Sequence, residues 1–170
     1  MVCFIMLTGA RFSEAATLPW TQVDLDSGGW KLPDPKNRKP ITLPLSSLAR
    51  EILKDRIREN EFVFSGRSGG HIKDCRAVLA KLAEHIDHKI SPHDLRRTFA
   101  AVAKAAGVRF TDRKLLLNHS IPGDVTSDHY DDNDLRNMMP EAEAIAKWIT
   151  RQATLAADNI VDLSTRRATA

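Results

Sequence analysis

The stretch Ser91-Pro92-His93-Asp94-Leu95-Arg96-Arg97-Thr98 places an imidazole and two guanidiniums within one turn at the start of an apolar segment. His93 and Arg96 are three residues apart, so a helix that begins here carries both side chains on one face. A histidine can move a proton near neutral pH, and an arginine can hold two phosphate oxygens at once. The pattern fits an anion site, and it fits equally well a capped helix start with a solvated arginine pair.

Arg11 and Glu14 repeat this three-residue spacing just after a glycine break in the opening apolar segment. The carboxylate can orient the guanidinium, although an ordinary surface ion pair has the same spacing. Lys36 lies in the basic turn between Pro35 and Pro40, which separates two short apolar runs. Such a hairpin can bring a lysine to a DNA phosphate, and a solvated loop tip explains the same residues.

Two further side chains with chemical potential lie later in the sequence. His119 follows an apolar run, so it is expected at a helix end, where a histidine often serves only as a favourable C-terminal charge. Tyr130 is the only tyrosine in 170 residues. The remaining histidines have no ligand-like spacing, and the two cysteines do not form a metal motif. No metal site is therefore expected.

Apolar periodicity predicts a mainly helical fold. The expected helices span residues 2–7, 45–60, 73–85 and 134–154, with another that begins at Pro92 and stops at Gly107. Ser13 and Asp112 are the expected caps of two shorter helices. Ile57, Val78 and Leu82 fall on the faces predicted to point inward, and Pro140 is expected to divide the last long helix.

Between these helices the sequence predicts a small antiparallel sheet. Pro, Gly and Asp punctuate the chain from Trp20 to Leu45, and short apolar runs at Gly29–Leu32 and Ile41–Leu43 read as strands. The predicted fold class is therefore mainly α, and the small sheet makes it an α+β fold. At 170 residues with 42% hydrophobic content, the chain can bury one core, and one domain is expected.

The composition indicates which binding partners and which cellular compartment are expected. A formal net charge of +3 and a pI near 9.0 favour a polyanionic partner. The opening apolar run Val2–Leu7 is far too short to span a bilayer and has no signal-peptide flanks, so no membrane partner is expected. Two cysteines without a disulfide framework favour a reducing compartment.

Five motifs follow one another along the chain. They are Thr8-Gly9-Ala10-Arg11 with Glu14, Lys36 in its hairpin before Leu43-Pro44-Leu45-Ser46, His93-Asp94-Leu95-Arg96-Arg97-Thr98, Leu116-Leu117-Asn118-His119-Ser120, and Tyr130. Together they resemble the catalytic domain of tyrosine recombinases of the phage integrase family. Two departures are visible: Asn118 stands where the family often has glycine, and Tyr130 lies slightly farther from His119 than is usual.

The resemblance implies a role for each matching residue. Arg11 and Arg96 match the arginines that clamp the scissile phosphate, a task suited to forked, permanently charged guanidiniums. Tyr130 matches the nucleophile that becomes joined to the DNA 3′-phosphate and releases a 5′-hydroxyl. Lys36 matches the general acid that protonates the departing oxygen.

Three more residues match supporting positions of the family. His93 matches the position usually given a general-base or phosphate-bonding role, and His119 matches the second imidazole, usually a hydrogen-bond donor to the phosphate. Glu14 matches an acidic residue that supports the clamp from behind. Because the phosphotyrosine keeps the energy of the broken bond, the resemblance implies no cofactor.

The resemblance also implies an organisation. The chain corresponds to the catalytic domain over 1–170, with an N-terminal DNA-binding domain absent and a C-terminal tail at 155–170 that docks on a neighbouring protomer or folds back. The implied partners are double-stranded DNA, three further protomers in a tetrameric synapse, and accessory DNA-bending or excision factors, in the cytoplasm of a bacterium and associated with its nucleoid. Two alternatives stay open: type IB topoisomerase-like relaxation, and a non-catalytic DNA-binding prophage relic.

Overall fold

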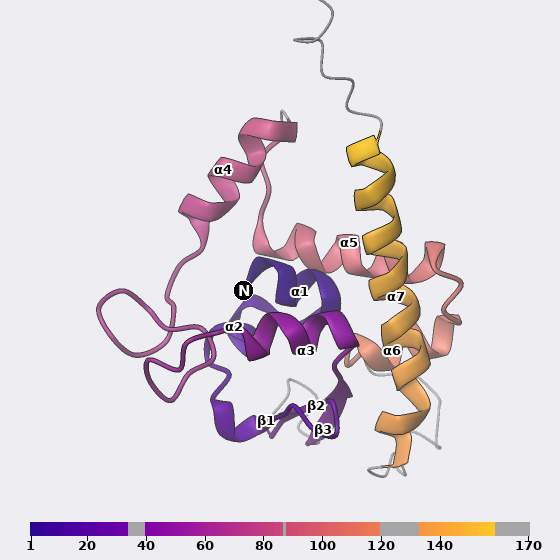
Figure 1. The fold of residues 1–170 in the computed structure, drawn as a ribbon, viewed down its shortest axis with the longest axis horizontal. Coiled ribbons are helices and arrows are strands. Elements are labelled where there is room, and N and C mark those ends of the chain that lie inside the picture. Colours follow the sequence, from indigo (N-terminus) through magenta and orange to yellow (C-terminus); the bar gives the residue numbers. More distant parts are fainter. Residues whose placement is uncertain (34–39, 87, 120–132, 159–170) are drawn as a thin grey trace, which may run out of the picture.

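Helix α1 (Val2–Thr8) lies in the middle of the fold, packed between α3 (Ser47–Lys54) and α5 (Pro92–Ala105) (Figure 1). The computed structural model describes residues 1–33, 40–86, 88–119 and 133–158. Phe4 and Ile5 of α1 are fully buried, which explains the apolar opening of the sequence. This short helix is therefore a core element, and the predicted helix over residues 2–7 is confirmed.

A three-stranded antiparallel sheet covers one end of the helical core, as predicted (Figure 1). Its order is β1 (Val23–Asp24), β2 (Gly29–Leu32) and β3 (Ile41–Pro44), preceded by a turn of 3-10 helix at Trp20–Gln22. Trp30 pairs with Leu43 across β2 and β3 and is completely buried, with its ring edge-on to Phe4 at 5.4 Å. The sheet is thus attached to α1 through aromatic packing.

Helix α1 ends at Gly9, and this turn directs the chain toward α2 (Phe12–Ala16). Gly9 has φ +68°, and a Cβ there would lie 2.5 Å from the Phe99 ring, so both the conformation and the space require glycine. The expected Ser13 cap is wrong, because α2 begins one residue after Arg11 and Ser13 lies inside the helix. The carboxylate of Glu14 satisfies the Arg11 N–H, so this helix start does not need the serine.

Two helices in the middle of the chain differ from their predictions. Helix α3 ends at Lys54, so the prediction over residues 45–60 is too long, and Ile57 is 80% exposed instead of buried. Helix α4 (Arg76–Ile86) buries only Leu79, whereas Val78 and Leu82 are exposed. This helix projects from the body of the fold, and no described helix or strand covers Val78 and Leu82 (Figure 1).

Helix α5 runs from Pro92 to Ala105, close to the predicted limits. Ser91 caps it through its hydroxyl, which accepts the Asp94 N–H at 3.3 Å, while the Asp94 carboxylate accepts the Ser91 N–H at 2.9 Å. Gly107, in a left-handed turn with φ +83°, follows the helix end. The start of α5 is therefore fixed by side-chain bonds on both sides of Pro92.

The last two helices pack against α5. Helix α6 (Phe110–Leu116) begins after Arg109, so the expected Asp112 cap is wrong; Asp112 instead accepts the Arg109 Nε–H at 2.8 Å. Helix α7 (Asn133–Asp158) runs continuously through Pro140, which therefore does not divide it, and takes in the first four residues of the expected tail. Glu143 of α7 also accepts the Ser47 N–H of α3 at 2.6 Å. None of the helices in the described ranges is long and apolar enough to cross a membrane.

Candidate active site

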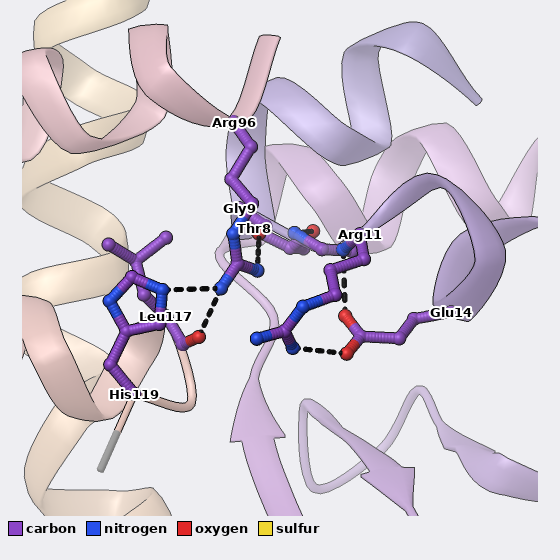
Figure 2. Close-up of polar contacts among 8 residues, drawn as sticks. Thr8, Gly9, Arg11, Glu14, Arg96, Leu117 and His119 are labelled. Carbon is purple, nitrogen blue, oxygen red and sulfur yellow. Dashed lines mark hydrogen bonds and ion pairs between the residues drawn. The ribbon is translucent and has the colours of Figure 1, made fainter. Parts of the chain in front are cut away.

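Arg96 lies on the buried side of α5, where the ends of two other helices meet it (Figure 2). Its Nη1 donates to the Gly9 carbonyl after α1, and its Nη2 donates to the Leu117 carbonyl after α6. Carbonyls at helix C-termini carry partial negative charge and lack partners within the helix. Two chain turns thus hold the guanidinium without neutralising its charge.

His119 reaches the same guanidinium from the end of α6. Its Nε2 lies 3.1 Å from Arg96 Nη2, and its main-chain N–H donates to the Lys114 carbonyl at 2.9 Å. Asn118, in the turn before it, has φ +46°, the positive-φ conformation that asparagine tolerates better than most residues. This residue stands in for the glycine expected at the turn and directs both the Leu117 carbonyl and the His119 imidazole toward Arg96.

Arg11 approaches the cluster from the start of α2 (Figure 2). Glu14 holds it twice: Oε2 accepts the Arg11 N–H at 2.7 Å, and Oε1 accepts an Nη1 proton at 2.6 Å. The i,i+3 ion pair expected from the sequence is therefore present, and it orients a guanidinium that remains partly exposed, at 29% of its side-chain surface. Among the described residues, Glu14 contacts only one edge of the Arg11 guanidinium, so its other edge can contact a ligand.

The proximity of these cations lowers two pKa values. Burial, followed by the positive charge of Arg11, lowers the pKa of Arg96 to about 10. Burial, followed by the charges of Arg96, Arg11 and Lys114, lowers the pKa of His119 below its usual range. Like charges gathered at a partly buried place are costly unless an anion joins them. The arrangement therefore favours the binding of an anion.

A cleft of about 440 Å³ opens beside the two arginines. It lies between the starts of α2 and α5, and its lining includes Arg11, His93 and Arg96. His93 is exposed in the first turn of α5, at the rim. The structure therefore brings together five of the seven residues expected at the site: Arg11, Glu14, His93, Arg96 and His119.

The other two predicted residues, Lys36 and Tyr130, lie outside the described residues. Sequence reasoning missed the main-chain carbonyls of Gly9 and Leu117, because a carbonyl has no residue type to signal it. The glycine after Thr8 was the available signal for the first of these carbonyls, because it marks the end of a helix. In the described part of the chain, no three His, Cys, Asp or Glu side chains are grouped to hold a metal ion.

Comparison with known proteins agrees with this geometry. The family model described as "Phage integrase family" matches residues 1–134. The chain belongs to the phage integrase family. The prophage integrase IntF of Escherichia coli K12 is 28% identical over 169 residues, which are 94% of this chain and 36% of IntF. The putative integrase/recombinase y4qK of Sinorhizobium fredii is 31% identical over 119 residues, 65% of this chain and 39% of that protein.

Solved structures show that this integrase-family chain has a tyrosine-recombinase fold. The integrase of mycobacterium phage Brujita matches with a TM-score of 0.67 at 21% identity, over 85% of this chain and 50% of that one. XerH recombinase, bound to a palindromic difH substrate in a post-cleavage complex, matches with a TM-score of 0.58 at 22% identity, over 80% of this chain and 42% of that one. The chain spans little more than a third of the length of the curated relatives it matches.

Proposed function

We propose that this chain supplies the catalytic centre of a site-specific DNA recombinase that cuts and rejoins strands through a covalent 3′-phosphotyrosine. One observation carries the proposal: Arg11 and Arg96, from separate helices, lie together at a cleft, and the described residues place no carboxylate on the Arg96 guanidinium. In the transition state of phosphoryl transfer, negative charge spreads over the non-bridging oxygens of the phosphate. Two fixed guanidiniums stabilise that charge.

The proposed reaction has two transfers. The Tyr130 oxygen attacks phosphorus, and the phosphorus bond to the 5′-oxygen breaks; the phenolic proton leaves to a base at the site, the role proposed for His93. Lys36 gives its proton to the departing 5′-oxygen. A 5′-hydroxyl of another strand then attacks the phosphotyrosine and reverses these steps, so no bond energy is lost and no cofactor is consumed.

His119 and Glu14 are proposed as supports for the clamp. With its Nε2 at 3.1 Å from Arg96, His119 lies where a phosphate held by that arginine would also touch the imidazole. Glu14 fixes the direction of Arg11. Duplex DNA is the proposed substrate, and the DNA complexes of XerH and of the Tn1549 transposon integrase among the structural neighbours support it. We propose that four protomers hold two duplexes during exchange.

The test uses duplexes of randomised sequence that carry a nick, incubated with the parent chain or with Tyr130→Phe. A short 5′ fragment diffuses away after cleavage, which traps the covalent intermediate. We expect a DNA adduct that survives boiling in detergent from the parent and none from the phenylalanine variant. Because the chain has one tyrosine, phosphotyrosine recovered after digestion of the adduct identifies Tyr130. Absence of any adduct would favour a non-catalytic DNA-binding protein.

A further inference from the structure

The cleft beside the arginines is lined by apolar residues as well as by cationic ones. Phe12 and Pro92 line it together with Arg11, His93 and Arg96. Phe12 is the first residue of α2, directly after Arg11, and Pro92 is the first residue of α5, directly before His93. Each helix start therefore presents one group suited to a phosphate and one group suited to an apolar surface.

Its size and lining indicate more than a phosphate. A volume of about 440 Å³ falls in the range of clefts that hold a small organic ligand, about 300 to 1,000 Å³. A phosphate gripped by Arg11 and Arg96 carries nucleosides on its ester oxygens, and these must leave along the walls of the cleft. Phe12 adjoins Arg11 in the chain and lines the same cleft, so it can offer an aromatic surface to the nucleoside.

Phe12 also has a structural role in the core, and the test must distinguish that role from ligand binding. It is half-buried and packs against the main apolar cluster, and it also lines the cleft. Pro92, by contrast, is explained by its place at the first position of α5. Packing on the core therefore does not account for the place of Phe12 in the cleft lining.

We propose that the Phe12 ring is a subsite for the nucleoside attached to the scissile phosphate, which packs against it while Arg11 and Arg96 hold the phosphate. This inference rests on the proposed function, because it takes the arginine pair as the phosphate site. Base contacts with aromatic side chains tolerate any base, since every base has a π-face. The subsite therefore positions the substrate without reading its sequence.

The experiment compares two soluble phosphodiesters by NMR titration: thymidylyl-(3′→5′)-thymidine, and dimethyl phosphate, which lacks nucleosides. Both are expected to shift the side-chain Nε–H signals of Arg11 and Arg96. Only the dinucleotide is expected to shift the Phe12 ring signals, and it should bind about fivefold or more tightly than dimethyl phosphate. Phe12→Ala should remove that preference.

Two further variants control for folding and for aromatic surface in general. Phe12→Leu keeps apolar bulk in the core and should retain only part of the preference for the dinucleotide. Phe110→Ala removes a ring that is 62% exposed on α6, outside the cleft lining, and should leave the preference unchanged. Amide spectra of each variant establish that it is folded before its titration is compared.

The outcomes separate this inference from the proposed function. If dimethyl phosphate shifts the arginine signals but the dinucleotide binds no better, or if Phe12→Ala keeps the full preference, the nucleoside subsite is wrong and the phosphate clamp stands. If neither phosphodiester shifts Arg11 or Arg96, the clamp itself is wrong, and the subsite is overturned with it.

Discussion

Arg96 is held by the main chain instead of by a carboxylate. Its described hydrogen-bond contacts are the Gly9 and Leu117 carbonyls and the His119 imidazole, all neutral acceptors. A buried cation with neutral partners keeps its full charge for a ligand, whereas Arg11 shares part of its charge with Glu14. The two arginines therefore differ in setting: Arg96 is buried with neutral partners, and Arg11 is partly exposed and paired with Glu14.

His119 gives a prediction at this scale. Its folded pKa is lowered by burial and by the nearby cations, so below about pH 6.5 the unfolded chain takes up a proton that the folded chain resists. The histidine then lowers the free energy of unfolding as the pH falls. We expect His119→Gln, whose amide oxygen can still accept from Arg96, to lose less stability than the parent between pH 7.5 and pH 5.

Urea unfolding of both chains across that pH range measures the effect. Other groups titrate in the same range, so the quantity of interest is the difference between the parent and the variant at each pH. This difference should change below pH 7 and be flat above it. Parallel curves through the whole range would mean that the cluster does not disfavour the charged imidazole.

At the scale of elements, four helix ends build the site and a fifth helix braces it. The ends of α1 and α6 supply carbonyls, the start of α2 supplies Arg11, and the start of α5 supplies His93. Helix α7 packs on α5 and on β3, and Glu143 ties it to the start of α3.

The Glu143 contact can be tested by substitution. Its Oε1 accepts the Ser47 N–H at 2.6 Å and the Ser47 Oγ–H at 2.7 Å, which caps α3 from another helix. Glu143→Ala should lower the free energy of unfolding by about 1 kcal/mol, the usual value of a lost helix cap. Glu143→Gln keeps an oxygen acceptor and should cost less. Equal urea midpoints for the alanine variant and the parent would contradict this role.

The sequence predicted elements better than it predicted which faces they bury. The α5 helix had its own signals, a serine cap, a proline and a glycine stop, and its limits agreed closely. The predicted burial of Ile57 and Val78 was wrong, because periodicity shows that a helix face is apolar but not whether a neighbouring element covers it. The predicted break at Pro140 was wrong because the packing of α7 on α5 and β3 outweighs one missing hydrogen bond.

The site shows the same division. Charged side chains with regular spacing could be found from the sequence, and Arg11, Glu14, His93, Arg96 and His119 do lie together. Their orientation depends on turns and carbonyls that come from distant parts of the chain. Gly9 and Leu117 contact Arg96 across 87 and 21 residues, and no local pattern encodes such contacts. Spacing paired Arg11 with Glu14 and His93 with Arg96, and the resemblance added His119, but neither indicated how these side chains are held.

For the whole molecule, the balance of charge sets the strength of long-range attraction to a polyanion such as DNA. Its 25 Lys and Arg residues are nearly offset by 22 Asp and Glu residues, so the formal net charge is only +3. Long-range attraction to a polyanion is then modest, and binding depends on local phosphate contacts such as the arginine cleft. The structural matches span about half of the solved recombinase chains.

We therefore predict that the isolated chain binds duplex DNA weakly and with strong salt dependence. With about three to five phosphate contacts, the association constant should fall roughly 40- to 500-fold between 50 and 200 mM salt. Fluorescence anisotropy of a labelled duplex measures the slope. Arg11→Gln should make the slope smaller by about one unit, because it removes one contact.

Arg109→Gln is the matched control for that slope. It removes the same single charge from a side chain that is 80% exposed and paired with Asp112, away from the cleft lining. If phosphate contacts at the cleft determine binding, Arg109→Gln leaves the slope close to that of the parent. Equal slopes for both variants would assign the salt dependence to net charge alone, and tight, salt-insensitive binding by the parent would contradict the prediction altogether.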